Sequence, residues 1–249
     1  MNRRIAGAVM AVAAATLLGL TGCATADGSA GSPAATTAAP VDASTSFAAA
    51  TAALTTKPIA FTMSLPGQFS VTGSMDPANR RAEVEGLMTM SGKNSDIHLI
   101  AIGDDVWLKM SGMTKLSNSK WMHTTADRVT GSTFDIANPK NPGGIMNLIN
   151  AVVQVEHSGA TGFRGLLDMT KSPSADPNMT GAVAEKLSAV PFTATTDTDG
   201  NLAGIRIDMS AFAPGVTMSA TYQYGRPVEV TAPPASDVMP MPTELLPGS

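Results

Sequence analysis

Apolar and polar residues alternate along most of residues 59–224, and this alternation constrains the fold more than any other feature of the chain. Successive side chains of a β-strand point to opposite faces of its sheet, so the pattern indicates strands with one apolar face and one wetted face. The clearest run is residues 216–224, where Val216, Met218 and Ala220 alternate with threonine and serine. Such strands are typical of an antiparallel sheet that buries a single face.

Equivalent runs occur throughout this part of the chain. They predict strands at residues 59–65, 69–75, 82–90, 97–101, 106–110, 163–169, 192–196, 203–209 and 216–224. Turn residues such as Pro66-Gly67 and Asp199-Gly200 separate the runs. Residues 197–201 resemble the start of a calcium loop, but Arg206 stands where that loop needs a glutamate, which favours a hairpin turn. Two strands between residues 105 and 125 are expected to form a hairpin with an exposed connection at 111–120.

Three segments space their apolar residues at helical intervals instead. They are residues 44–56, 144–155 and 179–190, all short and amphipathic. A one-sided sheet must cover its apolar face, and these helices are the elements available to do so. We therefore predict an α+β fold, in which a strongly curved antiparallel sheet carries short helices over its concave apolar face.

The first 23 residues have the pattern of a lipoprotein export signal. Arg3 and Arg4 precede an apolar run at residues 5–20, which is too short to span a bilayer comfortably. The run closes with Leu-Thr-Gly-Cys, a bacterial lipobox ending at Cys23, the only cysteine of the chain. We expect acyl chains on Cys23 to anchor the protein at the extracytoplasmic face of the cell membrane.

Composition divides the rest of the chain. The prediction is a signal peptide at 1–22, a lipidated flexible tether at 23–43, one domain at 44–232 and a disordered proline-rich tail at 233–249. The whole chain has a formal net charge of −4 and shows no basic patch, which argues against nucleic acid as a partner. We expect the domain to be monomeric.

Several motifs, taken in order, resemble a known family. They are Val71-Thr72-Gly73, residues 103–109 (GDDVWLK) with Lys120-Trp121, residues 162–168 (GFRGLLD), and Val190-Pro191-Phe192 before Asp199-Gly200. Over residues 44–230 the chain resembles the LppX/LprG-type actinobacterial lipoproteins, whose domain is similar to the half-open barrel of LolA and LolB. The resemblance implies an apolar cavity between sheet and helices that binds an acylated lipid or lipoglycan. This chain differs from the family in its few aromatic residues and many methionines.

The residues expected to line such a cavity share the inward parity of their strands or the apolar stripe of a helix. They are Phe61, Met63, Val71, Val84, Met88, Leu99, Leu108, Ile149, Val153, Phe163, Leu167, Leu187, Phe192, Ile205, Ile207, Met218 and Tyr222. Many inward positions are methionine, which adapts to ligands of variable shape but also fills gaps in a packed core. Periodicity alone leaves both interpretations open.

The sequence shows no constellation for catalysis, metal binding or a cofactor. His98, His123 and His157 are scattered and are interpreted as surface residues, and Glu83 and Glu85 as part of a solvated outer face. Three positions remain open for Trp107 from the sequence alone: it packs under a helix, lines the mouth of a cavity or contacts the membrane.

The favoured function is thus a non-enzymatic lipid carrier. The alternative is a structural or sensory envelope lipoprotein that recruits a protein partner.

Overall fold

The computed structural model describes residues 41–90, 92–112, 120–130, 132, 134–135, 138, 140–141, 144–171 and 180–246. All of them belong to one compact unit, Pro40–Ser249. The predicted signal peptide, Cys23 and nearly all of the predicted tether lie outside the described residues. No helix within these ranges is long and apolar enough to cross a bilayer.

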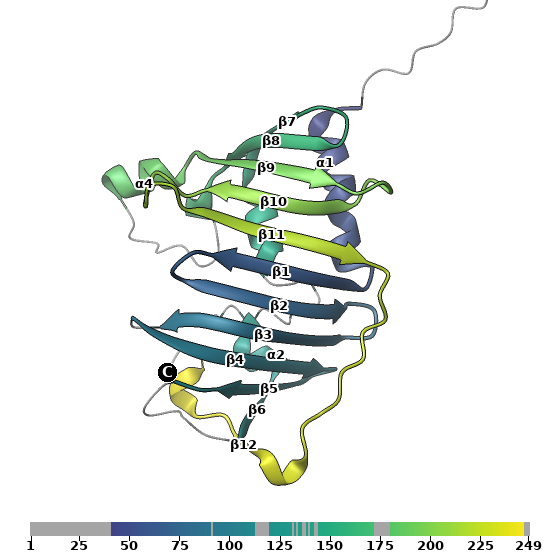
Figure 1. Cartoon of the computed structure of the whole chain (residues 1–249), viewed down its shortest axis with the longest axis vertical. Helices are drawn as coiled ribbons and strands as arrows, with labels where there is room; N and C mark the ends of the chain where they lie inside the picture. Colours follow the sequence, from purple (N-terminus) through teal and green to yellow (C-terminus); the bar gives the residue numbers. More distant parts are fainter. Residues whose placement is uncertain are drawn as a thin grey trace, which may run out of the picture. The chain divides into compact units, whose positions relative to one another are not determined.

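Within the described ranges, twelve strands form a single open sheet (Figure 1). The order across the sheet is β12-β6-β5-β4-β3-β2-β1-β11-β10-β9-β8-β7. Only β12 pairs in parallel, with β6, and every other neighbouring pair is antiparallel. In chain order the strands are β1 (Ile59–Leu65), β2 (Phe69–Asp76), β3 (Arg81–Met90), β4 (Lys93–Ile102), β5 (Asp105–Met110), β6 (Trp121–Thr125), β7 (Val152–His157), β8 (Gly162–Leu167), β9 (Val190–Thr196), β10 (Leu202–Asp208), β11 (Thr217–Tyr224) and β12 (Val238–Pro240). The predicted antiparallel sheet is confirmed.

The alternation of the sequence becomes alternation of burial. In β1, Ile59, Phe61 and Met63 are buried while Thr62 between them is exposed. The predicted hairpin turns also form. In them Gly67 and Gly200 adopt φ angles of 77° and 82°, in the left-handed region that residues with a side chain rarely occupy. The 197–201 segment is a hairpin turn, in which the Asp197 carboxylate accepts hydrogen bonds from the backbone N–H groups of Asp199 and Asn201.

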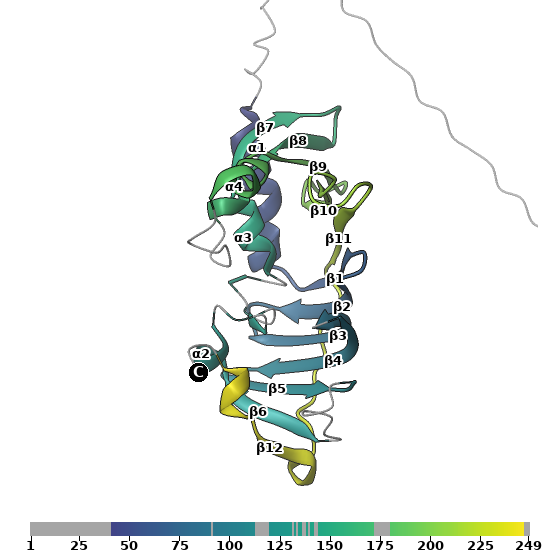
Figure 2. The same ribbon diagram turned by 90° about the vertical axis from the view of Figure 1, so that its left-hand side faces the viewer.

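Short helices lie on one side of the sheet (Figure 2). The first is α1 (Ala43–Ala52), which continues as the 3₁₀ helix η1 (Ala53–Thr55) and confirms the predicted N-terminal helix. Asp42 caps α1 by accepting hydrogen bonds from Ser44 N and Thr45 N at 3.1 and 3.2 Å. The others are α2 (Ala126–Val129), α3 (Ile145–Ile149), η4 (Met169–Lys171) and α4 (Gly181–Leu187).

The predicted helix at residues 144–155 is wrong beyond its first half. Helix α3 ends at Ile149, and residues 152–157 form β7, which pairs with β8 at the edge of the sheet. Val152 and Val153 fitted a helical stripe, but β-branched side chains favour a strand when a pairing edge is available. The predicted helix at 179–190 is confirmed over 181–187, although α4 buries none of its side chains.

The predicted disordered tail is wrong for residues 235–246. They form the 3₁₀ helix η5 (Ala235–Asp237), strand β12 and the 3₁₀ helix η6 (Thr243–Leu245), and Met241 and Leu246 are buried in the main core. Proline was the reason to expect disorder, yet Pro240 stands in an edge strand, where a missing N–H is tolerated. The domain therefore extends beyond residue 232.

Residues 225–237 reach β12 by crossing the outer face of the sheet, the face opposite the helices. Val228 and Val230 are buried there against Ile100, with Trp107 and Trp121 partly buried beside them. In Figure 1 this segment is the yellow chain that runs from β11 past the ends of the middle strands to β12. It covers part of the sheet that alternation alone predicts to be wet.

Candidate functional site

The structure gathers nearly all predicted cavity residues into one apolar cluster on the helix side of the sheet. Buried members are Phe61, Met63, Val71, Val84, Leu99, Leu108, Phe163, Leu167, Phe192, Ile205, Ile207 and Tyr222, while Met88, Ile149, Leu187 and Met218 are partly buried. Val153 lies outside this cluster, with 49% of its surface exposed. Because residues 152–157 form a strand instead of a helix, Val152 and Val153 point to opposite faces, and only Val152 packs on the cluster. Of the predicted cavity residues, however, only Ile149 and Val153 line the pocket between α1, α3 and β7 that is described below.

One part of this cluster is filled by the protein itself. In the strands β2–β6 and β12, which we call the packed half, Val84, Leu99, Leu108 and Met122 have no exposed surface. These four side chains are shielded from solvent and belong to the main apolar core, as the filled-core interpretation expects.

The other part is covered by helices, and its strands also hold fully buried side chains such as Leu167 and Ile205. Strands β1 and β7–β11 carry α1, α3 and α4, and we call this the helical half. Phe47 of α1 packs on the rings of Phe163 and Phe192, with centroid distances of 5.3 and 5.6 Å. Ile149 and Leu187 are only partly buried against the cluster. These helices are short, and α4 exposes 51% of Val183.

A pocket of about 450 Å³ opens between α1, α3 and β7 in the helical half. Its apolar wall includes Phe47, Ala48, Met146, Ile149 and Val155, and none of the described residues lining it carries a charge. Polar groups border the same space, namely the side chains of Ser44, Thr51, Asn150 and Gln154. The volume lies within the range of about 300–1,000 Å³ that is usual for small-molecule sites.

Apolar side chains that face inward lie in a row at the strand ends on the side of the sheet where α4 lies (Figure 1). Met88 faces Phe69 across β3 and β2, Phe69 faces Leu65, and Met218 faces Ile207 across β11 and β10. Phe69, Met88 and Met218 are only partly buried. The flexible methionines predicted to face inward are therefore incompletely covered at this rim, whereas Met75 and Met110 are fully buried.

The apolar face also holds a buried hydroxyl without a partner. Tyr222 lies on β11 opposite Phe61 of β1, and its Oη makes no hydrogen bond. Burial raises the pKa of Tyr222 well above its usual value. Tyr224, two residues along, instead donates to the carbonyl of Leu202 at 2.7 Å. An unpaired buried hydroxyl costs about 1–3 kcal/mol, so a polar group that reached it would be favoured.

A second pocket of about 720 Å³ lies on the outer side of β5 and β6, under the C-terminal segment. Trp107, His123, Arg128 and Pro233 are among the residues that line it. Trp107 is partly buried beside Val228 and Val230, and Pro233 and Ala235 line the same pocket, so the C-terminal segment covers its outer side.

The three histidines lie in different surroundings. His157 Nε2 lies 3.2 Å from the carbonyl oxygen of Val41, and His123 Nε2 lies 2.7 Å from Asp105 Oδ1. His98 lies beside Glu83 and Glu85 on the outer face. The sequence did not predict this last grouping, because it depends on the register between β3 and β4.

No protein-family model matches the chain, and no curated protein matches it.

Proposed function

We propose that the protein is an exported lipoprotein that binds an acylated lipid in the pocket between α1, α3 and β7. The single observation that carries the proposal is this pocket of about 450 Å³, with an apolar wall and an uncharged polar border. The likeness of the sequence motifs to the LppX/LprG-type lipoproteins, and through them to the LolA-like fold, supports the same function. The lipobox ending at Cys23 would place the domain at the membrane that supplies the ligand.

Binding would be physical and not catalytic. Each methylene of an acyl chain that leaves water for the apolar wall contributes roughly 0.8 kcal/mol. The border of Ser44, Thr51, Asn150 and Gln154 offers hydrogen bonds to ester, hydroxyl or sugar groups. Because no described lining residue is charged, the pocket favours an uncharged portion of the lipid over a phosphate.

The test uses two neighbouring alanines of α1, both exposed to solvent. Ala48 lines the pocket and Ala49 does not. Ala48→Trp fills the pocket with an indole ring, whereas Ala49→Trp adds the same ring to the solvent side of the helix. The protein and both variants are purified without detergent exchange, extracted with organic solvent and analysed by mass spectrometry.

We expect lipid in the extracts of the wild type and of Ala49→Trp, and little in that of Ala48→Trp. Absence of lipid from the wild-type extract, or equal lipid in both variants, would reject the proposal. Circular dichroism of the three proteins checks that the helix and the sheet are intact.

A second candidate function is supported by the outer pocket of about 720 Å³. An envelope lipoprotein that recruits a protein partner needs a surface groove with aromatic and cationic residues, and Trp107 and Arg128 provide both. This function predicts that Arg128→Ala weakens association with an envelope protein in cross-linking experiments, while Ala48→Trp leaves it unchanged.

A further inference from the structure

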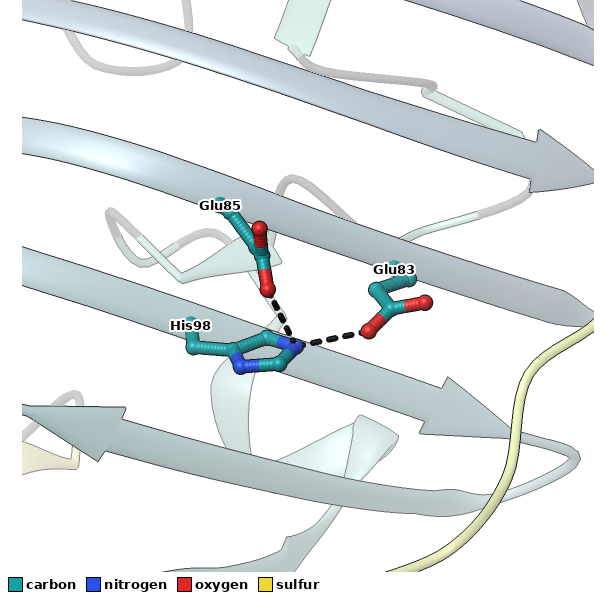
Figure 3. A group of neighbouring side chains, drawn as sticks. All are labelled: Glu83, Glu85 and His98. Atoms are coloured by element: carbon teal, nitrogen blue, oxygen red, sulfur yellow. Dashed lines mark hydrogen bonds and ion pairs between the residues drawn. The ribbon is translucent and has the colours of Figure 1, made fainter.

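Glu83, Glu85 and His98 meet on the outer face of the sheet, away from the proposed lipid pocket (Figure 3). The pairing of β3 with β4 places Glu85 directly opposite His98. Glu83 lies two residues from Glu85 on the same strand, so all three side chains leave the same face. The backbone of one hairpin therefore fixes their positions.

The three potential ligand atoms lie within 4.8 Å of one another. His98 Nε2 lies 2.7 Å from Glu83 Oε1 and 3.2 Å from Glu85 Oε1. An imidazole nitrogen carries at most one proton, and this one proton must serve two carboxylates. A metal ion at the same place would accept a lone pair from each of the three groups at once.

The charge of the cluster also favours a cation. Among the ion pairs of the described residues, Glu83 and Glu85 have His98 as their partner and no lysine or arginine. Lys109 stands directly opposite His98 on β5, but its Nζ lies over the Trp121 ring, 5.7 Å from the centroid, and it forms no ion pair with either carboxylate among the described residues. With a neutral imidazole, the two carboxylates therefore lie together without a paired cation. A divalent ion would neutralise both.

The imidazole is held in place before any ion binds. Its ring meets the Trp121 ring edge-on, with a centroid distance of 4.6 Å and an interplanar angle of 65°. Trp121 is in turn partly buried with Val228 and Val230 of the C-terminal segment. The side chain of Glu85 is 60% exposed, so water can reach the cluster and complete a coordination shell.

We propose that Glu83, Glu85 and His98 bind a divalent transition-metal ion, with Zn²⁺ as the best match. One imidazole nitrogen and two carboxylate oxygens suit Zn²⁺, which takes such ligands at about 2.0–2.2 Å and a water as the fourth. Ca²⁺ and Mg²⁺ match less well, because they prefer six or more oxygen ligands. The ion would tie β3 to β4 beneath the C-terminal segment.

The test is isothermal titration calorimetry, in which zinc chloride alone is added to the full chain in a buffer that does not chelate metals. We expect one zinc ion per chain, and a loss of affinity of at least about tenfold in His98→Ala and in Glu83→Gln. The matched control is His123→Ala, since His123 lies on the same outer face and pairs with the single carboxylate of Asp105 at 2.7 Å. This control removes an imidazole and an ion pair but leaves the three ligands intact.

Thermal unfolding followed by circular dichroism confirms that each variant is folded, and added zinc should raise the unfolding temperature of the wild type but not of His98→Ala. The proposal is overturned if the wild type shows no saturable zinc binding, which would leave the cluster as an ion pair only. It is equally overturned if His98→Ala binds as tightly as the wild type, or if His123→Ala loses as much affinity as His98→Ala.

Discussion

The packed half and the helical half belong to one sheet but are covered in different ways. In the packed half, side chains such as Leu99 and Met122 are fully buried on the helix side, and residues 225–237 cover part of the outer face as well. In the helical half the cover consists of α1, α3 and α4, of which α4 buries no side chain. The difference teaches that a sheet of uniform alternation can be covered by a chain segment on its outer face at one end and by helices on its inner face at the other.

The largest effect should follow from removing the C-terminal cover. A chain that ends at Pro234 loses β12 together with Met241 and Leu246, which are 5% and 8% exposed. Burial of one such side chain contributes roughly 1.5–3 kcal/mol, so we expect a loss of roughly 3–6 kcal/mol in the free energy of unfolding. Urea unfolding measures it. An unchanged midpoint would mean that the tail is dispensable and that the two halves are covered alike.

A pair of truncations compares the two halves directly. Leu99→Ala in the packed half should lower the free energy of unfolding by about 2–5 kcal/mol, because it leaves a cavity in a filled core. Ile149→Ala in the helical half should lower it less, since that side chain is only partly buried at the wall of the pocket. Equal losses in urea unfolding would contradict the comparison, and a loss of bound lipid is expected from Ile149→Ala alone.

Neighbouring tyrosines of the helical half provide a smaller test. Tyr224→Phe removes the hydrogen bond to Leu202 and should destabilise the protein by about 0.5–1.5 kcal/mol. Tyr222→Phe removes an unpaired hydroxyl and should be neutral or stabilising when no ligand is bound. If Tyr222→Phe destabilises the lipid-free protein as much as Tyr224→Phe does, its hydroxyl is paired in solution.

Tyr222 and Tyr224 also predict how the free energy of unfolding changes at alkaline pH. Burial raises the pKa of both Tyr222 and Tyr224 above the value of about 10 in the unfolded chain. The folded state therefore holds these protons more tightly, and the stability that they contribute is present below about pH 10 and lost as the pH rises further. The double variant with phenylalanine at both positions should show a shallower loss of stability above pH 10 in urea unfolding.

The smallest effect is expected in α4. Val183 is 51% exposed, and Val183→Ser should change the free energy of unfolding by no more than roughly 0.5 kcal/mol. Val84→Ser in the packed half is the matched control, because the same change there places a hydroxyl in a site with no exposed surface. A large effect at Val183 would show that α4 packs tightly and that the helical half is not thinly covered.

Sequence reasoning predicted the strands well because their alternation is local information. It predicted the wrong element at Val152–His157, because Val152 and Val153 satisfied a helical period and the pairing edge of β8 was not known from sequence. It missed β12 for a related reason. A proline-rich composition indicates that ordering the segment is costly, but it does not show that the free edge of β6 is available for pairing. The cavity residues were found by parity, but parity cannot distinguish a filled core from an open wall.

The Glu83, Glu85 and His98 cluster shows what more could have been predicted. Its signal is the pairing between β3 and β4, whose register brings Glu85 to His98 once Met90 is paired with Lys93. The separation of the residues along the chain hid their proximity. Counting back from a hairpin turn would find such clusters in other antiparallel sheets.

The pairing of β1 with β11 has a consequence for how the chain reaches its native state. Strands β1 to β6 form a ladder of successive neighbours, and so do β7 to β11, but Ile59 meets Tyr224 only across most of the domain. Each ladder can form through contacts between strands that are near in the sequence, whereas the pairing of β1 with β11 closes a large loop and is slow by comparison. The same holds for the pairing of β6 with β12. Until β11 has been synthesised this edge of β1 has no partner, so the two ladders are expected to join late in folding.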